Sequence, residues 1–374
     1  MGGLPACSAV AGTPVEVMYA ALAEAAENLP KPAPKDVWER HHQLVAAIDQ
    51  MLATVAAGKA GDGAGTKPRW LDGVMARELD TMSQEAWGLD RFVRVRLVER
   101  LGLVDLEPDD TYVLAMISGL GPDKAAKLRD DPDLVERALW RVFEVEGGGQ
   151  VSLTNVDRFF GEEWRRAFLA LVEDGTLDRE RVLSGCLRTL GRDFAAYRAS
   201  WYSATYLALE PTTEETASTQ PDLRRLLASD VPATVAFALK QLSRVQKAGL
   251  LDVAATLDAL PPATLARAKG TALAALALAR SAQTRSAQTR SAQTYSAPAE
   301  HARAVGVVAR TALGHPHADV QRAAAAILTG LGEADAVRAA AEDLAPGVRQ
   351  ELGLQPAVRP YDVPAGDPAP APVQ

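Results

Sequence analysis

The chain has 374 residues, which is enough for two ordinary domains or for one elongated array of repeats. Its residues are 48% hydrophobic and 24% charged, so a sizeable core is available, and its net charge of −8 argues against duplex nucleic acid, which normally requires a basic surface. The only two cysteines, Cys7 and Cys186, exclude a disulfide framework and a four-cysteine metal site. Because no run of about 18 apolar residues is present, we expect no membrane partner and a location in a reducing cytoplasm.

Residues 1–35 are expected to form an N-terminal helix followed by a proline-rich connector. Thr13 and Glu16 are spaced as a capping box, and Pro14 stands at the first helical position, where proline is favoured. Prolines at positions 30, 32 and 34 then predict a stiff, extended segment. We therefore expect a helical extension that precedes the main body of the protein.

Residues 36–210 are expected to form an aromatic-rich helical lobe, which opens with a long amphipathic helix from about Val37 to Ala56. This lobe contains all six tryptophans of the chain. Its segment Phe92–Leu97 alternates apolar and polar residues as a strand would, but the apolar residues also share one face of a helix. We predict a helix there, because no neighbouring segment offers a partner strand.

After residue 210 the expected core is rich in alanine and leucine. Residues 211–280 are predicted to form HEAT-like repeats, introduced by a flexible Thr/Glu-rich loop over 210–220, and residues 298–353 a C-terminal helical repeat. Between them lie tandem Ser-Ala-Gln-Thr pentads, which predict a low-complexity linker over 281–297. Residues 354–374 form a Pro/Ala-rich tail that we expect to be disordered, and such a tail is typical of a junction with a further domain.

A short apolar signature recurs along the chain and predicts the fold. Each copy places apolar residues at i, i+3, i+4 and i+7, and the first three copies start 48 and 52 residues apart (135 to 183 to 235). The copies are Val135/Ala138/Leu139/Val142, Leu183/Cys186/Leu187/Leu190, Val235/Ala238/Leu239/Leu242 and Val320/Ala323/Ala324/Ile327. Recurrence at this interval is typical of stacked helical hairpins, so we expect an all-α, HEAT-like, right-handed α-solenoid with an N-terminal helical extension.

Residues from about Trp164 to Ala279 resemble a bacterial HEAT-like family known only as a domain of unknown function. The stretches that carry this resemblance are Leu177–Leu183, Leu207–Pro211, Val235–Leu242, Leu260–Pro262 and Lys269–Ala272. The resemblance covers about a third of the chain. It implies a HEAT-like solenoid, usually followed by more sequence, and it carries over no catalytic residues.

A search for catalytic and metal-binding motifs is negative. No phosphate-binding glycine loop, dinucleotide motif, nucleophile elbow or His-Glu-x-x-His motif is present, so we predict no catalytic residue and no cofactor. Asp131 before Pro132 is better explained as a helix N-cap than as a metal ligand. The turn His315-Pro316-His317 offers ligands for zinc only if it folds back towards His301, and we interpret its histidines as polar turn residues.

Aromatic and basic residues combine into one candidate binding groove. The predicted groove consists of Trp164, Arg165, Arg166, Tyr197, Arg198, Trp201 and Tyr202. Aromatic residues at these helical spacings are more often core residues. If they line a groove instead, it would hold a peptide or an unstacked base.

The densest basic run is Arg91, Arg94, Arg96 and Arg100, with acidic residues interspersed. We interpret it as a solvated helix face with ion pairs between neighbouring turns. The alternative is a ridge that tracks phosphates, as in HEAT-like DNA glycosylases. A continuous arginine stripe that includes Arg94, Arg165 and Arg198 would support this alternative.

The function expected from the sequence is a non-enzymatic scaffold or adaptor that binds a protein or peptide on the concave face of the solenoid. Two other classes stay open: a nucleic-acid-binding, DNA glycosylase-like HEAT protein, and a helical enzyme without a recognisable motif.

Overall fold

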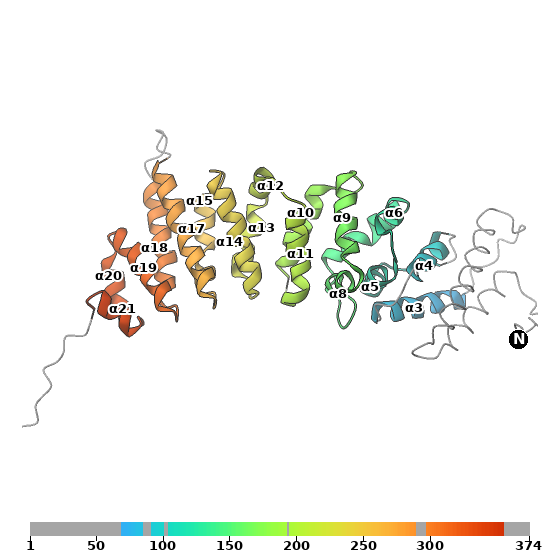
Figure 1. Ribbon diagram of the computed structural model, residues 1–374, viewed down its shortest axis with the longest axis horizontal. Helices are drawn as coiled ribbons and strands as arrows, with labels where there is room; N and C mark the ends of the chain where they lie inside the picture. The colour runs from blue at the N-terminus through green and yellow to red at the C-terminus, as the bar shows by residue number, and fades with distance from the viewer. Residues whose placement is uncertain (1–68, 85–90, 101–103, 193, 289–296, 355–374) are drawn as a thin grey trace, which may run out of the picture. The chain divides into compact units, whose positions relative to one another are not determined.

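The computed structural model describes residues 69–84, 91–100, 104–192, 194–288 and 297–354, and divides the chain into two units, Met1–Asp178 and Arg179–Gln374 (Figure 1). In the described ranges, regular structure consists of helices, with one isolated β-bridge between Gly148 and Val151. The prediction of an all-α fold is confirmed. The calls on residues 1–68, including both N-terminal helices, lie outside the described residues, as does the tail beyond Leu354.

The first unit is a cluster of short helices around an aromatic core. Its elements are α3 (Arg69–Gln84), α4 (Arg91–Arg100), α5 (Asp110–Gly119), α6 (Lys124–Arg129), α7 (Pro132–Arg137), the 3-10 helix η1 (Leu139–Phe143), α8 (Leu153–Phe160) and α9 (Glu163–Glu173). Helix α5 contacts α3, α4, η1 and α8, while α6 packs on α9. Phe92 of α4 meets Tyr112 of α5 edge to face, with ring centroids 5.0 Å apart. Helix α4 also confirms the prediction that Phe92–Leu97 is helical.

Aspartate side chains cap the first turns of α5 and α7 in the first unit. The Asp109 carboxylate accepts a hydrogen bond from the Tyr112 backbone N–H at the start of α5. Asp131 accepts one from the Leu134 N–H at the start of α7, with Pro132 in the first turn. Each cap satisfies a backbone donor that the first helical turn leaves without a partner. The interpretation of Asp131 as an N-cap is confirmed.

The first copy of the apolar signature does not form one continuous helix. Its four side chains are buried, but α7 ends at Arg137 and the rest of the copy lies in η1. There the Arg141 N–H bonds to the Ala138 carbonyl, which is the tighter i+3 pattern of a 3-10 helix. The prediction of a regular hairpin helix at this copy is therefore wrong.

The second unit begins at α10 and consists of helices in regular succession. Its elements are α10 (Arg179–Leu190), α11 (Ala196–Ala208), α12 (Thr213–Ser218), α13 (Gln220–Arg225), η2 (Leu226–Ala228), α14 (Pro232–Lys247), α15 (Val253–Ala259), α16 (Pro261–Thr264), α17 (Lys269–Gln288), α18 (Ala297–Leu313), α19 (Ala318–Gly330), α20 (Ala334–Ala339) and α21 (Pro346–Glu351). Tyr206 of α11 packs edge to face on Phe237 of α14, with centroids 5.4 Å apart. The unit boundary at residue 178 thus falls inside the lobe predicted for 36–210, because α10 and α11 pack with the helices that follow them.

The helices of the second unit contact one another in two layers. The first layer contains α10, α12, α13, α15, α16, α18 and α20, and the second layer contains α11, α14, α17 and α19. Within the first layer α10 contacts α13, α13 contacts α15, α15 and α16 contact α18, and α18 contacts α20. Within the second layer α11 contacts α14, α14 contacts α17, and α17 contacts α19. Figure 1 shows these second-layer helices in chain order from green to red.

The remaining copies of the signature form the apolar faces between the two layers. The copy in α10, including Cys186, and the copy in α14 are entirely buried. In α19, Val320, Ala324 and Ile327 are buried and Ala323 is half-buried. Cys186 is fully buried, which confirms its interpretation as a small core residue, and this burial raises the pKa of its thiol.

Two segments expected to be irregular are helical. The predicted loop 210–220 contains α12 and the start of α13, because Thr212 and Glu215 form a capping box in which each side chain bonds the backbone N–H of the other. Helix α17 continues through Gln288, so residues 281–288 of the predicted linker are helical. The Ser-Ala-Gln-Thr sequence contains no glycine or proline that would end the helix.

Candidate functional site

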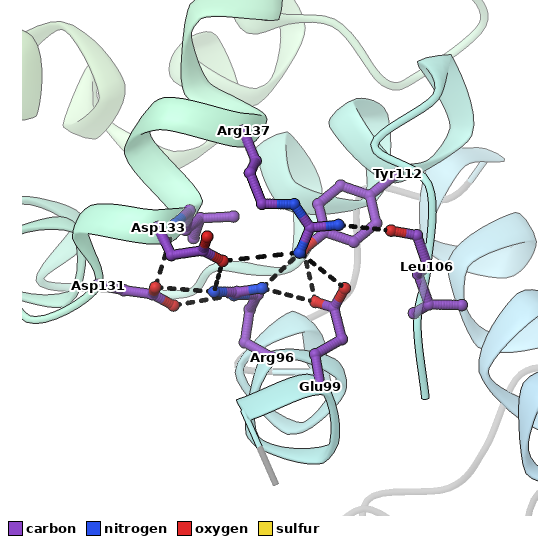
Figure 2. Close-up of polar contacts among 8 residues, drawn as sticks. Arg96, Glu99, Leu106, Tyr112, Asp131, Asp133 and Arg137 are labelled. Atoms are coloured by element: carbon purple, nitrogen blue, oxygen red, sulfur yellow. Dashed lines mark hydrogen bonds and ion pairs between the residues drawn. The ribbon is translucent and has the colours of Figure 1, made fainter. Parts of the chain in front are cut away.

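A densely connected polar site surrounds Arg96 in the first unit. Helix α4 carries Arg96 and Glu99 on one face, and the start of α7 carries Asp131 (Figure 2). The Nε and Nη2 atoms of Arg96 donate to the two carboxylate oxygens of Asp131, each at 2.8 Å, and Nη1 donates to Glu99 Oε2 at 2.9 Å. Such a bidentate pair fixes both distance and orientation, so it joins α4 firmly to α7.

Further contacts complete this group, which we call the Arg96 cluster: Arg96, Glu99, Tyr112, Asp131, Asp133 and Arg137. The Tyr112 hydroxyl donates to Glu99 Oε2 at 2.6 Å. Asp133 Oδ2 lies 3.0 Å from Arg96 Nη2 and 3.6 Å from Arg137 Nη1. Arg137 Nη2 donates to the Leu106 carbonyl at 2.8 Å, and Figure 2 shows it above Arg96 and Glu99. The cluster therefore also fastens α5 and the segment before it.

Burial and pairing act against each other in the Arg96 cluster. Burial by itself raises the pKa of Asp131, but the hydrogen bonds from Arg96 and from the Leu134 N–H outweigh it, so the net pKa lies below its ordinary value. Burial likewise lowers the pKa of Arg96, and its bonds to Asp131 and Glu99 raise it above the ordinary value. For Tyr112, burial and the bond to Glu99 both raise the pKa. The Asp131 carboxyl and the Arg96 guanidinium are therefore charged at neutral pH, and the Tyr112 phenol is neutral.

The Arg96 cluster corrects the prediction of a solvated basic face for Arg96. Arg96 is only 4% exposed, and its guanidinium is engaged by carboxylates on two helices, so it is unavailable to phosphate. Arg100 is exposed, and the Arg94 side chain lies outside the described residues. We conclude that this site holds the fold together. The signal present in the sequence was Glu99, one turn from Arg96, together with the acidic residues at the start of α7.

The predicted aromatic groove is divided between the two units. Trp164, Arg165 and Arg166 belong to α9 in the first unit, and Tyr197, Arg198, Trp201 and Tyr202 belong to α11 in the second. Trp164, Trp201 and Tyr202 are 0%, 2% and 3% exposed, so these three are core residues and the prediction is corrected for them.

The other groove residues are more accessible than these three. Arg165 is partly exposed and pairs with Glu162 at 2.9 Å, and Arg166 is exposed and donates to the Gly161 carbonyl. Tyr197 is 46% exposed and Arg198 is half-buried. Because Arg165 already has a carboxylate partner, the structure adds no support for the arginine stripe that the nucleic-acid alternative requires.

A surface with an unusual charge distribution lies on the second layer of the second unit. Helices α11, α14 and α17 contain no aspartate or glutamate, and α19 contains one, Asp319. The first layer instead carries acidic residues on nearly every helix: Glu180, Glu214, Glu215, Asp222, Asp258, Glu300 and Asp335. We call the exposed side of α11, α14, α17 and α19 the second-layer face, and it is the candidate interaction site.

Small residues and cations make up most of the second-layer face on α14 and α17. After Pro232, the exposed positions of α14 follow one helical stripe: Ala233, Ala236, Lys240, Arg244 and Lys247. On α17 the exposed positions are Lys269, Gly270, Ala274, Ala277, Arg280, Ser281 and Thr284. Small side chains permit close approach of a partner, and the cations supply positive charge. Analysis of the sequence missed this site, although the absence of acidic residues from 232–247 and 269–288 is visible there.

Within the described ranges, no group of three or more His, Cys, Asp or Glu side chains is arranged to hold a metal ion. His315 is buried in its turn and contacts the Ala266 carbonyl at 3.0 Å through Nε2, which ties the turn to the segment after α16. No helix in the described part of the chain is long and apolar enough to cross a membrane.

Comparison with known proteins identifies a family. A family model described as "Domain of unknown function (DUF6493)" matches residues 66–270, which is more than half of the chain. No curated protein and no solved structure matches the chain significantly. The match begins well before the stretch from Trp164 to Ala279 that carried the resemblance in the sequence, and it spans α3 to α16. The chain is a member of the DUF6493 family, whose function is unknown.

Proposed function

We propose that the protein is a non-enzymatic scaffold or adaptor whose second unit is a HEAT-like α-solenoid. The observation that supports this most strongly is the layered contact pattern, in which first-layer helices contact first-layer helices and second-layer helices contact second-layer helices. In an α-solenoid each repeat contacts its neighbours in this way, and the stacked helices offer a continuous surface for a partner. Recurrence of the apolar signature in α10, α14 and α19 is consistent with this.

The partner in this proposal is a protein or peptide held on the second-layer face. A scaffold of this type binds by shape, with side chains from several helices contributing small individual contacts. The exposed residues Ala236 and Ala277 have small side chains, so a partner can approach the backbones of α14 and α17 closely on this face. A cytoplasmic location is part of the proposal and rests on the low cysteine count of the sequence, which has two cysteines in 374 residues.

Site-specific photo-crosslinking tests the proposal. A photoreactive phenylalanine analogue is placed in the full chain at Ala236 or Ala277 on the second-layer face, and at Ala254 or Ala299 on the first layer as matched controls, since all four positions are exposed. In cells that encode the protein, we expect protein adducts from 236 and 277 only. Adducts from 254 and 299 alone, or none from any position, would contradict it. Adducts that disappear on nuclease treatment would favour the nucleic-acid-binding alternative.

A further inference from the structure

Among the described residues of the second unit, many cations have carboxylate partners. On the first layer and its turns, ion pairs join Arg179 with Glu215 at 2.6 Å, Arg224 with Asp252 at 3.3 Å, Arg225 with Asp222 at 2.5 Å, and Arg310 with Glu333, whereas the exposed arginines 188, 192 and 303 form no ion pair with a described residue. At the C-terminal end of the second layer, Asp319 pairs with Lys269 at 2.7 Å and with Arg322 at 2.5 Å. Helices α14 and α17 differ from the first layer because they carry exposed cations and contain no acidic residue.

Lys240 and Arg244 of α14 and Arg280 of α17 are exposed and make no ion pair with any described residue. The Ser281 hydroxyl donates to Gln246 Oε1 at 2.9 Å, which places Arg280 at the level of the C-terminal half of α14. Lys240 precedes Arg244 by about one helical turn, or roughly 6 Å along the axis. The three cations therefore form one group across two neighbouring helices, which we call the α14–α17 patch.

The helix dipole explains the presence of only one of the three cations of the α14–α17 patch. A cation in the last helical turn is stabilised by the partial negative charge of the helix C-terminus, and this accounts for Arg244. Lys240 stands in the middle of α14, and Arg280 lies well before the end of α17 at Gln288. Neither has an ion-pair partner among the residues that the structure describes, although the chain carries more acidic than basic residues, 48 against 40.

We propose that the α14–α17 patch binds an acidic peptide segment of a partner protein, with apolar side chains of that segment on α11. This inference rests on the proposed scaffold function and specifies its partner. Exposed Leu207 and Tyr197 of α11, which are 44% and 46% exposed, flank α14 on the side opposite α17. A peptide with mixed acidic and apolar residues matches both parts of the surface.

The observations favour a peptide over a nucleic acid. A long polyanion that extends beyond the patch is repelled by a chain of net charge −8. Base stacking has little support on this surface, because α14 and α17 carry no exposed aromatic side chain among the described residues and α11 offers a single exposed ring, that of Tyr197. A short acidic segment avoids the repulsion, because its charge is confined to the patch.

The test is a binding measurement on the full chain with a defined probe. The probe is a fluorescein-labelled peptide of about twenty residues with the repeat Glu-Glu-Leu-Ser, and its binding is measured by fluorescence anisotropy. Two comparators are used: the same peptide with Gln in place of Glu, and an oligothymidylate of similar length. We expect saturable binding of the Glu peptide only, and weaker binding as salt rises from about 50 to about 200 mM. The variant K240E/R244E/R280E should weaken this binding at least about tenfold.

A matched variant separates a local effect from a change in net charge. R188E/R192E/R303E reverses three exposed arginines on the first layer and its turns, so it changes the net charge equally, and it should bind the Glu peptide as the wild type does. Equal weakening by both variants, tighter binding of the oligothymidylate, or no binding of the Glu peptide would overturn the inference. Both variants are first shown to melt cooperatively, so that a fold defect is not read as lost binding.

Failure of this inference and failure of the scaffold proposal are distinguishable. If crosslinks from 236 and 277 capture a partner whose contact segment is not acidic, the scaffold proposal stands and the acidic-peptide inference fails. If no crosslink forms on the second-layer face, the scaffold proposal itself fails.

Discussion

The two units use the same kind of side chain in opposite ways. In the first unit Arg96 is 4% exposed and bonded to carboxylates on two helices, whereas in the second unit Arg244 and Arg280 are exposed and without an ion pair in the described chain. Burial explains the difference. A buried charge requires a partner within the fold, because its desolvation costs several kcal/mol, while an exposed charge keeps its hydration and can engage an external partner.

The units also differ in how their helices are joined. Helices α4, α5 and α7 of the first unit are fastened by the Arg96 cluster, which is polar and specific in geometry. The two layers of the second unit meet through repeated apolar faces of alanine, leucine and valine. A buried polar cluster joins one particular set of helices. Apolar faces can be repeated along the chain, because each new helix pair can use the same residue pattern. The following predictions test this contrast.

The largest effect is expected for Val235→Asp in α14. Val235 is 3% exposed and belongs to an apolar face, so the substitution buries a carboxylate without a partner. We expect the free energy of unfolding to fall by about 4 kcal/mol or more, which is comparable with the whole stability of a marginal domain. Thermal unfolding followed by circular dichroism should show that the cooperative transition of the second unit is lost.

Ala236→Asp is the control for this prediction. It introduces the same charge at the next residue, which is exposed on the second-layer face. At this exposed position the free energy of unfolding should change by no more than about 0.5 kcal/mol. Equal unfolding by both substitutions, or by neither, would show that the apolar face is assigned to the wrong side of α14.

The next effect in size is expected for Arg96→Met. The side chain keeps a similar volume, but Asp131 and Glu99 lose their principal partner while they stay buried. Removing one member of a buried pair typically costs about 3–5 kcal/mol. Chemical denaturation should show this loss in the first unit, and exposed Arg100→Met should cost less than about 1 kcal/mol. A near-neutral Arg96→Met would mean that the cluster contributes little to the fold.

The difference in unfolding free energy between the wild type and Arg96→Met should depend on pH, because the pKa of Asp131 is lowered in the folded state. A carboxyl whose pKa is lower in the folded state contributes stability that is fully present above its unfolded value, about 3.9, and is lost as pH falls through the folded value. The wild type should therefore exceed Arg96→Met in unfolding free energy by less and less as pH decreases below about 3.9, as measured by chemical denaturation at each pH. An advantage that stays constant from neutral pH into acid would exclude Asp131 as its source.

Much of this fold can be predicted from local patterns in the sequence. Helix starts at Asp131-Pro132 and at Pro232 depend on residues next to each other, and the apolar faces of α10 and α14 depend on spacings within one helix. The burial of Trp164 and Trp201 was the ordinary expectation for aromatic residues at helical spacing. Such features need no knowledge of distant segments.

What could not be predicted depends on contacts between distant segments or on overlooked local signals. Arg96 meets Asp131 from another helix, so the run of arginines around it looked solvated. The capping box of Thr212 and Glu215 was visible in the sequence, but the Thr/Glu composition around it favoured a loop. The charge difference between the two layers emerges only when alternate helices are assigned to the same layer, which requires the tertiary contacts.

The smallest effect, and the sharpest test of the contrast between the units, is expected for Arg179→Met. Like Arg96, Arg179 bonds a carboxylate through both Nε and Nη2, here on Glu215 of α12 at 2.6 and 3.1 Å. The Arg179 and Glu215 side chains are 37% and 30% exposed, against 5% and 10% for Arg96 and Asp131, so water replaces much of what is lost. We expect a cost of about 0.2–1 kcal/mol by chemical denaturation. If Arg179→Met and Arg96→Met cost the same, bidentate geometry rather than burial would determine the strength of these pairs, and the distinction between the units would lose its physical basis.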